Sequence, residues 1–324
     1  MILCVAPSPA VDRTARIAQL ADGLIVRPTE LVVLPGGKAL TAARVARVLG
    51  AIVATTGYAG GHAGRWITEA LAAEGLSPRF VETGAEARTT YVLIDRHGRS
   101  YLIYEPAPAV TVAETAQLHE LLRDELLPGA DFVVVAGSFP AGSNPNSAGA
   151  IVELAHAAGR PCLVDTSGET LKAVASARPE VVKISLEEAL AAGWASVADP
   201  DPARSATEHL CSAGAGLAVV TDGRRGAVAF DGADHWRIEV PAVRAASPVG
   251  SGDAFSAGLA VALAEGRPLP AALAYGAAAG TANAQSSGGG RFDLATFETV
   301  LEAVRVEPIR RARPGAPMRS PGHV

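Results

Sequence analysis

The sequence lacks the features that mark membrane, secreted or disulfide-rich proteins. Its 324 residues include only three cysteines, which form no C-x-x-C pair, and Cys4 and Cys162 lie within apolar runs. We therefore interpret these two as small core residues. No apolar run reaches the ~18 residues that suggest a membrane-spanning helix, and residues 1–20 show no basic-then-apolar leader. We expect a cytoplasmic protein without membrane association.

Charge and histidine content exclude two further classes. The formal net charge is −5, so no overall positive field attracts nucleic acid or an anionic membrane. The seven histidines show no paired ligand spacing such as H-E-x-x-H, so we expect no zinc site. The length alone permits either one large α/β domain or two smaller domains.

Short apolar runs typical of β-strands alternate with alanine-rich helical patterns along most of the chain. The strand candidates are "MILCVAP", "AIVATTGYAG", "DFVVVAGS", "PCLVDTS", "VVKIS" and "LAVVTDG". This alternation predicts a mainly parallel sheet with helices on both faces. Ligands of such sheets bind beyond the carboxyl ends of the strands, so we expect the functional residues there.

Two segments interrupt the alternation. Residues 88–106 read as a β-hairpin with its turn at Gly98, and residues 21–35 read as further strand. The final segment, "EPIRRARPGAPMRSPGHV", has prolines and arginines without periodicity, which predicts disorder. We therefore divide the chain into an α/β core (residues 1–13, 34–87 and 107–306), a β lid (residues 14–33 and 88–106) and a disordered tail (residues 307–324).

The lid hairpin is apolar on both faces. Tyr91 and Leu93 would face one side and Val92 and Ile94 the other, because neighbouring strand residues point in opposite directions. A small flap that exposes apolar residues on both sides is unfavourable, so each face needs a cover. We expect the substrate against one face and a second subunit against the other, which predicts a homodimer. A helix of the same chain is the alternative cover.

The segment "SPVGSGDAF", residues 247–255, suggests chemistry. Gly250 and Gly252 flank Ser251 and precede Asp253, and apolar residues at helical spacing follow. A glycine-rich turn before a helix directs N–H groups and the positive end of the helix dipole at one point, which suits a phosphate. A carboxylate there would repel the phosphate unless it takes the proton of a hydroxyl that attacks the phosphorus. The alternative interpretation is that Asp253 only caps the helix.

Two familiar nucleotide motifs are absent. No segment matches G-x-x-x-x-G-K-[ST], and Phe255 stands where a dinucleotide fingerprint would have its third glycine. A second segment of glycines followed by a helical pattern, "PGGKALTAARVARVLG", begins at Pro35. It places Lys38 and Thr41 together at the open end of the predicted helix.

Further motifs follow in order along the chain: "SPAVD" at residues 8–12, "AGSFPAG" at 136–142, "VDTSGE" at 164–169 and "GTANAQSSGGGRFD" at 280–293. Together with the two glycine-rich segments they resemble the phosphofructokinase B group of ribokinase-like sugar kinases, most closely its 1-phosphofructokinase and tagatose-6-phosphate kinase branch. The resemblance extends from Met1 to about Val304. It implies a ribokinase-like three-layer αβα sandwich with a mainly parallel central sheet and a small β-sheet lid. It also implies ATP as phosphoryl donor, with Mg²⁺.

The resemblance assigns roles to particular residues. Asp253 would be the general base, and Gly250, Ser251 and Gly252 would form the anion hole for the moving phosphoryl group. The residues expected to bind the sugar or its existing phosphate are Asp12, Arg27, Gly36, Gly37, Lys38, Thr41, Arg88 and Ser138. Those expected around the nucleotide are Lys183, Ser185, Thr221, Gly223, Gly226 and Asn283.

Finer expectations accompany these assignments. Gly36 and Gly37 would let the sugar approach the backbone, whereas Arg27, Lys38 and Arg88 would meet its phosphate. Asn283 would lie in the adenine pocket. Magnesium would be held mostly by ATP phosphates and water, with Glu188 acting through water.

Two positions depart from the family pattern. Where the family commonly reads G-G-K-G-x-N, this chain has Thr41 in place of the asparagine, and where it reads K-P-N-x-x-E, this chain has Ser185 in place of the asparagine. Three functions are therefore considered. The leading one is an ATP-dependent kinase of a phosphorylated ketohexose, such as fructose 1-phosphate. The alternatives are a kinase of an unphosphorylated sugar or nucleoside, and a non-catalytic sugar or nucleotide sensor.

Overall fold

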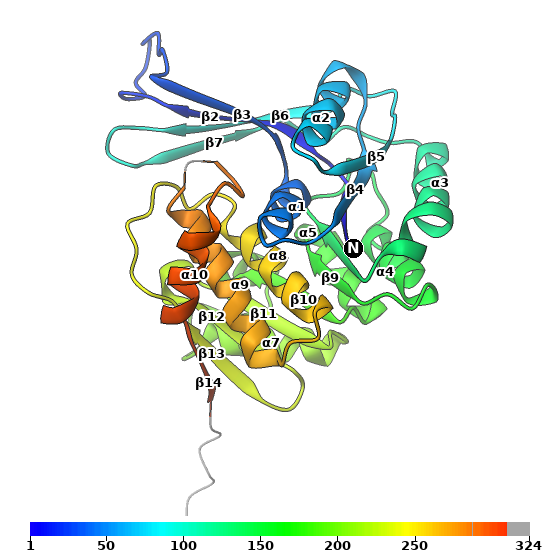
Figure 1. Ribbon diagram of the computed structural model, residues 1–324, viewed down its shortest axis with the longest axis vertical. Helices are drawn as coiled ribbons and strands as arrows, with labels where there is room; N and C mark the ends of the chain where they lie inside the picture. Colours follow the sequence, from blue (N-terminus) through cyan, green and yellow to red (C-terminus); the bar gives the residue numbers. More distant parts are fainter. Residues whose placement is uncertain (287, 310–324) are drawn as a thin grey trace, which may run out of the picture.

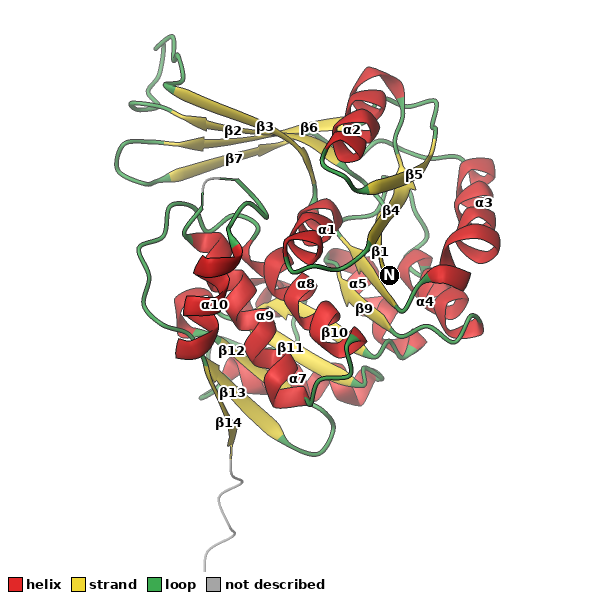
Figure 2. Ribbon diagram, viewed as in Figure 1, coloured by secondary structure: helices red, strands yellow, loops and turns green. Residues whose placement is uncertain are grey.

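The chain forms a large α/β unit and a smaller, separate β-sheet (Figure 1, Figure 2). The computed structural model describes residues 1–286 and 288–309. The strands of the larger sheet are β1 (Ile2–Ala6), β4 (Val53–Tyr58), β5 (Ser77–Val81), β8 (Phe132–Ala136), β9 (Cys162–Asp165), β10 (Val181–Ser185), β11 (Leu217–Thr221), β12 (Ala227–Phe230), β13 (His235–Glu239) and β14 (Arg305–Ile309). Their order is β14-β13-β12-β11-β10-β9-β8-β1-β4-β5.

The strands from β5 through β1 to β11 run parallel and are covered on both faces. In β1, Ile2 and Cys4 enter one hydrophobic layer while Leu3 and Val5 enter the other. The six strands predicted from the sequence are all present, since burial on both faces requires the continuous apolar runs from which they were predicted. Cys4 and Cys162 are fully buried free thiols, as expected.

Helices cover the two faces of this sheet. One face carries α1 (Lys38–Val48), α2 (Gly61–Ala73), α8 (Ser251–Ala264), α9 (Leu269–Ala284) and α10 (Leu294–Ala303). The other carries α3 (Val112–Leu121), α4 (Ser147–Ala157), α5 (Gly168–Val174), α6 (Leu186–Ala191) and α7 (Pro202–Ala213). Short turns lie at Leu122–Leu126, which is π-helical, and at Leu127–Gly129, Ala175–Ala177 and Gly223–Arg225, which are 3₁₀. The predicted αβα sandwich is confirmed, and no helix within the described ranges is long and apolar enough to cross a membrane.

The edges of the large sheet were not predicted. At one edge β12, β13 and β14 are antiparallel, and at the other edge lies β5. The edge strand β14 contains Pro308, which has no N–H to donate and is tolerated in an edge position. Strand β14 ends at Ile309, so residues 307–309 of the predicted tail belong to a strand. The rest of that tail, residues 310–324, lies outside the described residues.

The smaller sheet has four strands in the order β3-β2-β6-β7. They are β2 (Ala10–Arg16), β3 (Glu30–Gly36), β6 (Arg88–Ile94) and β7 (Ser100–Tyr104). The hairpin of β6 and β7 turns at Gly98, whose φ of 78° suits glycine, as predicted. Reading residues 21–35 as strand is wrong for residues 21–29, because Gly23 has a φ of 71° and Pro28 lacks an N–H.

Candidate active site

The carboxyl ends of the parallel strands carry the polar residues, as the sequence analysis expected. Asp165 ends β9, Ser185 ends β10 and Thr221 ends β11. Helix α8 meets these ends because Ser256 donates to Asp165, and strand β2 meets them because Asp12 accepts from Gly37 N, next to Lys38, which contacts Asp165. The core and the small sheet therefore share one site.

A buried carboxylate that the sequence analysis left without a role organises this site. Asp165 is fully buried and accepts hydrogen bonds from Lys38 Nζ at 2.7 Å, Lys183 Nζ at 2.8 Å and Ser256 Oγ at 3.0 Å. Lys38 Nζ also contacts Glu188 Oε1 at 2.7 Å. A charge in a buried position needs such partners. The available signal was an aspartate that ends an apolar strand.

The first turn of α8 has the geometry of an anion hole. Gly250 precedes the helix with a φ of 81°, which favours glycine. The first intrahelical bond runs from Ala254 N to Gly250 O, so the N–H groups of Gly252 and Asp253 have no acceptor within the helix. A Cβ on Gly252 would lie 2.6 Å from Lys183 Nζ. Glycine therefore allows a buried ammonium group to lie directly beside this turn.

The surrounding charges give Asp253 an unusual pKa. Burial and the nearby Asp165 carboxylate raise the pKa of Asp253 to about 6, against the opposing effect of Lys38 and Lys183. The pKa of Asp165 lies well below its usual range, because the two lysines outweigh its burial. No hydrogen bond to the Asp253 carboxylate is found within residues 1–286 and 288–309. Asp253 thus resembles a base poised near neutral pH more than a helix cap.

Lys38 lies between the carboxylates of Asp165 and Glu188, near Asp253. Burial lowers its pKa, but the Asp165 and Glu188 carboxylates outweigh that effect and raise the pKa above its usual range. Lys38 therefore remains a fixed positive charge. Its expected contact with the sugar's existing phosphate stays a prediction, because its ammonium group lies between two carboxylates.

Ser185, which replaces the family's asparagine, has a structural role at the start of α6. Its hydroxyl accepts a hydrogen bond from Glu188 N at 3.1 Å and donates one to Glu188 Oε2 at 2.9 Å, while Ser185 N donates to the same oxygen at 2.8 Å. This capping box starts α6 and fixes the Glu188 carboxylate, whose other oxygen contacts Lys38.

Asn283 braces the turn before α8. The side chain is 1% exposed, its Nδ2 donates to Val249 O at 3.0 Å and to Ser251 Oγ at 3.3 Å, and its Oδ1 accepts from Gly290 N at 2.7 Å. Its amide group is therefore engaged within the protein, and an adenine contact stays a prediction. Thr41 packs beneath the same turn, since a Cβ on Gly250 would lie 3.2 Å from Thr41 Cγ2.

The small sheet contributes Asp12. Its carboxylate accepts a hydrogen bond from Gly37 N at 3.4 Å and another from the Thr90 hydroxyl. Burial raises the pKa of Asp12 although both hydrogen bonds oppose this. A Cβ on Gly36 would lie 1.8 Å from Asp12 Cγ, so this glycine makes room for the carboxylate. An approach of the sugar to the backbone of Gly36 and Gly37 stays a prediction.

Arg88 lies where β6 begins. Its Nη2 donates to Ser8 O at 3.2 Å and to Ser138 Oγ at 3.1 Å, which brings two predicted substrate-binding residues together. Arg88 Nε and Ser8 Oγ are buried, and neither has a hydrogen-bond partner in the described part of the chain. Such unpartnered buried polar atoms are uncommon in folded proteins. The expected contact of Arg88 with the sugar's phosphate stays a prediction.

Tyr104 is a further site residue that the sequence analysis missed. It lies opposite Thr90 in the register of β6 and β7, on the strand face that carries Asp12. Burial and the charges of Asp12 and Asp253 raise the pKa of its phenol. No motif includes Tyr104, and only the pairing of the strands brings it near the reacting groups.

Arg27 is not brought to the site within one chain. It is exposed in the segment between β2 and β3, beyond the pair Arg16 and Glu30 at the outer end of the small sheet. Asp12 lies four residues nearer the core than Arg16, which corresponds to roughly 13 Å along a strand.

The loop predicted beside the nucleotide follows β11. Thr221 Oγ1 donates to Ile184 O at 3.3 Å, and the 3₁₀ turn at Gly223–Arg225 follows it. Gly226 has a structural reason of its own, because a Cβ there would lie 1.9 Å from Ile238 O. The structure thus places this loop beside Ser185 at the strand ends, since Thr221 pairs with Ser185.

Comparison with known proteins identifies the family. Residues 5–295 match the family described as pfkB family carbohydrate kinase, and the chain belongs to it. It is similar to phosphofructokinase-2 from Escherichia coli solved in complex with potassium, with 28% identity and a TM-score of 0.86 over 93% of this chain and 98% of that one. A possible 1-phosphofructokinase from Thermotoga maritima shares the fold, with 22% identity and a TM-score of 0.81 over 96% and 100% of the two chains. A candidate ribokinase from Agrobacterium tumefaciens does so at 23% identity and a TM-score of 0.77, over 93% and 97%.

The charged residues show how the site could accommodate a metal ion. Within the described residues, no cluster of three or more His, Cys, Asp or Glu side chains could hold a metal ion. Lys38 and Lys183 contribute two positive charges, whereas Asp165, Glu188 and ionised Asp253 contribute three negative charges. A nucleotide triphosphate entering this site therefore finds no surplus positive charge.

Proposed function

We propose that the chain transfers the terminal phosphoryl group of ATP to a hydroxyl of a ketohexose phosphate. The observation that carries this proposal is that two kinds of group meet around Tyr104. Asp253, in the first turn of α8, and Arg88, which contacts Ser8 and Ser138, both act on the Tyr104 phenol through their charges. Arginine's planar fork suits a phosphate that is bound but not transferred.

The residues then have distinct tasks. Asp12 would orient the sugar hydroxyls, and Asp253 would take the proton of the attacking hydroxyl. The hydroxyl oxygen forms a bond to the γ-phosphorus while the bond to the β-phosphate oxygen breaks, and ADP leaves with that electron pair. Charge on the moving phosphoryl group would be stabilised by the N–H groups of Gly252 and Asp253 and by Lys38.

The charge balance supports Mg²⁺ as a companion of ATP. Because three carboxylates face two lysines, a divalent cation bound to the phosphates would offset the repulsion between ATP and the site. Glu188 is held in place by Ser185 and is suited to contact the hydration shell of such an ion. This agrees with a metal held mainly by phosphates and water.

The small sheet would act as a lid and as a dimer contact. Its inner face carries Asp12, Thr90 and Tyr104, and closure over the sugar would exclude water that could accept the phosphoryl group. The outer face carries Leu31, Tyr91 and Ile103, which are 50%, 38% and 54% exposed. Helix α2 packs against β2 and β3 of this sheet. A helix of the same chain, the alternative cover, would therefore cover only part of the outer face. A second copy would cover the rest, and one E. coli phosphofructokinase-2 structure is described as tetrameric.

A substrate panel tests this function. The purified protein is given ATP and Mg²⁺ with fructose 1-phosphate, fructose 6-phosphate, tagatose 6-phosphate, free sugars and nucleosides, and ADP release is measured. Fructose 1-phosphate is the first substrate to examine, and fructose 6-phosphate is the second because phosphofructokinase-2 from E. coli was solved in complex with it. We expect a phosphorylated ketohexose to give the highest kcat/KM. Turnover of only unphosphorylated acceptors contradicts the phosphate role of Arg88, and no turnover at all favours a sensor.

A further inference from the structure

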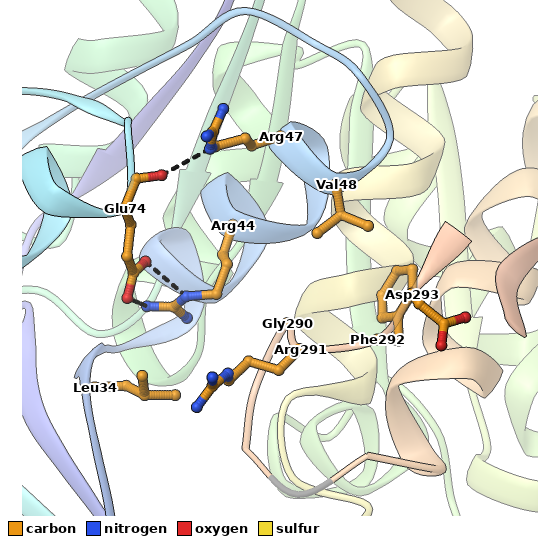
Figure 3. Close-up of a pocket in the computed structure, with 9 residues that line it drawn as sticks. All are labelled: Leu34, Arg44, Arg47, Val48, Glu74, Gly290, Arg291, Phe292 and Asp293. Carbon is orange, nitrogen blue, oxygen red and sulfur yellow. Dashed lines mark hydrogen bonds and ion pairs between the residues drawn. The ribbon is translucent and has the colours of Figure 1, made fainter. Parts of the chain in front are cut away.

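A cavity of about 780 Å³ lies outside the active site (Figure 3). It opens between α1, the end of α2, β3 and the segment 290–293 that leads into α10. Its volume falls within the range of roughly 300–1,000 Å³ that is typical of small-molecule sites. None of the residues assigned above to catalysis or to sugar binding lines it, so the cavity is distinct from the proposed active site.

One arginine builds the cavity. Arg44 is 8% exposed and contacts both carboxylate oxygens of Glu74, at 2.8 and 3.3 Å. It also donates to Gly289 O and Pro35 O, each at 2.9 Å. These four bonds use most of its N–H donors, and Glu74 offsets its charge, so Arg44 fixes the cavity wall.

Two other arginines line the cavity without an ion pair in the described part of the chain. Arg47 donates through Nε to the backbone oxygen of Glu74 at 2.7 Å, and its side chain is exposed, as is that of Arg291. Over residues 1–286 and 288–309, neither guanidinium forms an ion pair. Glu74 pairs with Arg44, whereas Asp293 caps α10 through Thr296 N at 2.7 Å and keeps its negative charge. The three arginines and two carboxylates that line the cavity leave one net positive charge.

The remaining walls are apolar. Leu34, Val48 and Phe292 line the cavity together with the arginines. A site that combines exposed guanidinium groups with apolar walls suits a ligand with a phosphate at one end and a less polar body. We propose that this cavity is a second binding site for a small phosphorylated molecule, of the nucleoside phosphate class, held by Arg47 and Arg291.

Hydrogen bonds connect the wall of the cavity to the turn before α8. Gly289 O accepts from Arg44, and the next residue, Gly290, donates its N–H to Asn283 Oδ1 at 2.7 Å. Asn283 in turn donates to Ser251 Oγ in the turn before α8 at 3.3 Å. A ligand against Arg291 therefore touches the segment that Asn283 ties to the anion hole.

Titration calorimetry with ADP tests the proposal. The double variant Arg47→Gln/Arg291→Gln removes both charges without touching the active site, and Arg123→Gln removes an exposed arginine on the opposite face of the sheet. We expect the wild type and Arg123→Gln to show two ADP binding events per chain. The double variant should lose one event, or weaken it by about tenfold or more, because charge-assisted hydrogen bonds to phosphate are lost. Unfolding temperatures check that all three chains are folded.

Two further measurements locate the event and define its chemistry. Hydrogen exchange with ADP should show protection of residues 288–293 in the wild type and not in the double variant. Identical titrations of all three chains, or protection confined to residues 250–256, would overturn the proposal. Inorganic pyrophosphate should bind to the same site more weakly than ADP, and equal affinity would overturn the nucleoside preference. Because the active-site event persists in every variant, failure here is distinct from failure of the proposed kinase activity.

Discussion

The two sheets of this protein contain similar apolar strands but are covered differently. In β8 of the large sheet all five residues are buried, because helices pack on both faces. In β7 of the lid, Leu102 and Ile103 point to opposite faces, and each is 54% exposed. The large sheet is thus covered on both faces within one chain, whereas the small sheet leaves apolar side chains exposed on both faces.

The same contrast divides the site. The core contributes Asp253, Asp165, Lys38 and Lys183, which are linked by short ion pairs or by close charge interactions in a buried position. The lid contributes Asp12 and Arg88, whose Nε is buried and has no hydrogen-bond partner in the described part of the chain. We propose that the core fixes the reacting groups, while the lid supplies contacts that a substrate completes. The predictions below test this division.

The largest effect should come from Asp253→Asn in the core. The variant keeps the shape of the side chain but cannot accept the proton, so turnover should fall by ~10²–10⁴-fold or more. ATP binding should change little. Steady-state kinetics and nucleotide titration measure the two effects, with Asp124→Asn on the surface as the control. Retention of more than a tenth of the activity would show that Asp253 is not the base.

Asp165→Asn should destabilise the core. It removes the carboxylate that neutralises Lys38 and Lys183, and breaking a buried ion pair typically costs about 3–5 kcal/mol. Denaturant unfolding measures this loss. Asp95→Asn is the lid counterpart, since Asp95 is also buried but pairs with one arginine, Arg99, which is exposed beside the β6–β7 turn. Its loss should be smaller, and equal losses would contradict the contrast between core and lid.

Arg88→Ala should affect substrate binding selectively. A charge-assisted hydrogen bond contributes about 1.5–3 kcal/mol, so the KM for the sugar phosphate should rise by roughly 10–100-fold, with little change in the KM for ATP. The exposed Arg96 near the lid turn provides the control as Arg96→Ala. Equal changes in both KM values would show that Arg88 does not bind the sugar phosphate selectively.

The pKa of Asp253 predicts opposite effects of pH on activity and on stability. Below about 6 the base is protonated, so kcat/KM should fall by about tenfold per pH unit. Stability should change in the other direction: the folded pKa lies above the ordinary 3.8, so the contribution of this group to stability is lost as the pH rises from about 4 to 6. Asp253→Asn should remove this loss. Unfolding curves at pH 4.5 and 7.5 compare the two chains, and an equal pH dependence contradicts the assignment.

The smallest effect on the folded chain should come from the outer face of the lid. Ile103→Asp changes an exposed residue, so the stability of a single chain should shift by only about 0.5 kcal/mol. The same change should dissociate the proposed dimer, because it places a charge in the apolar contact. Leu102→Asp is the matched control, with equal exposure on the opposite face. Light scattering at micromolar concentration measures the oligomeric state of the three chains. A monomeric wild type would contradict the proposed dimer.

The sequence by itself determined much of this protein. The continuous apolar runs of the parallel strands require helices on both faces, and the turn at residues 250–253 requires glycine for its φ and its close contact with Lys183. Both features are local, so their residues are close together in the chain. The position of Asp253 in the first turn of that helix could be predicted from the same local pattern.

Only the tertiary structure decided which distant residues meet. Asp165 contacts Lys38 across 127 positions, and Arg88 contacts Ser138 across 50, and no spacing rule connects such pairs. The structure also separated Arg27 from Arg88 within one chain, although both were expected at the same phosphate. The pKa of Asp253 depends on this assembly as well, because burial and the charge of Asp165 exist only once β9 and α8 pack together.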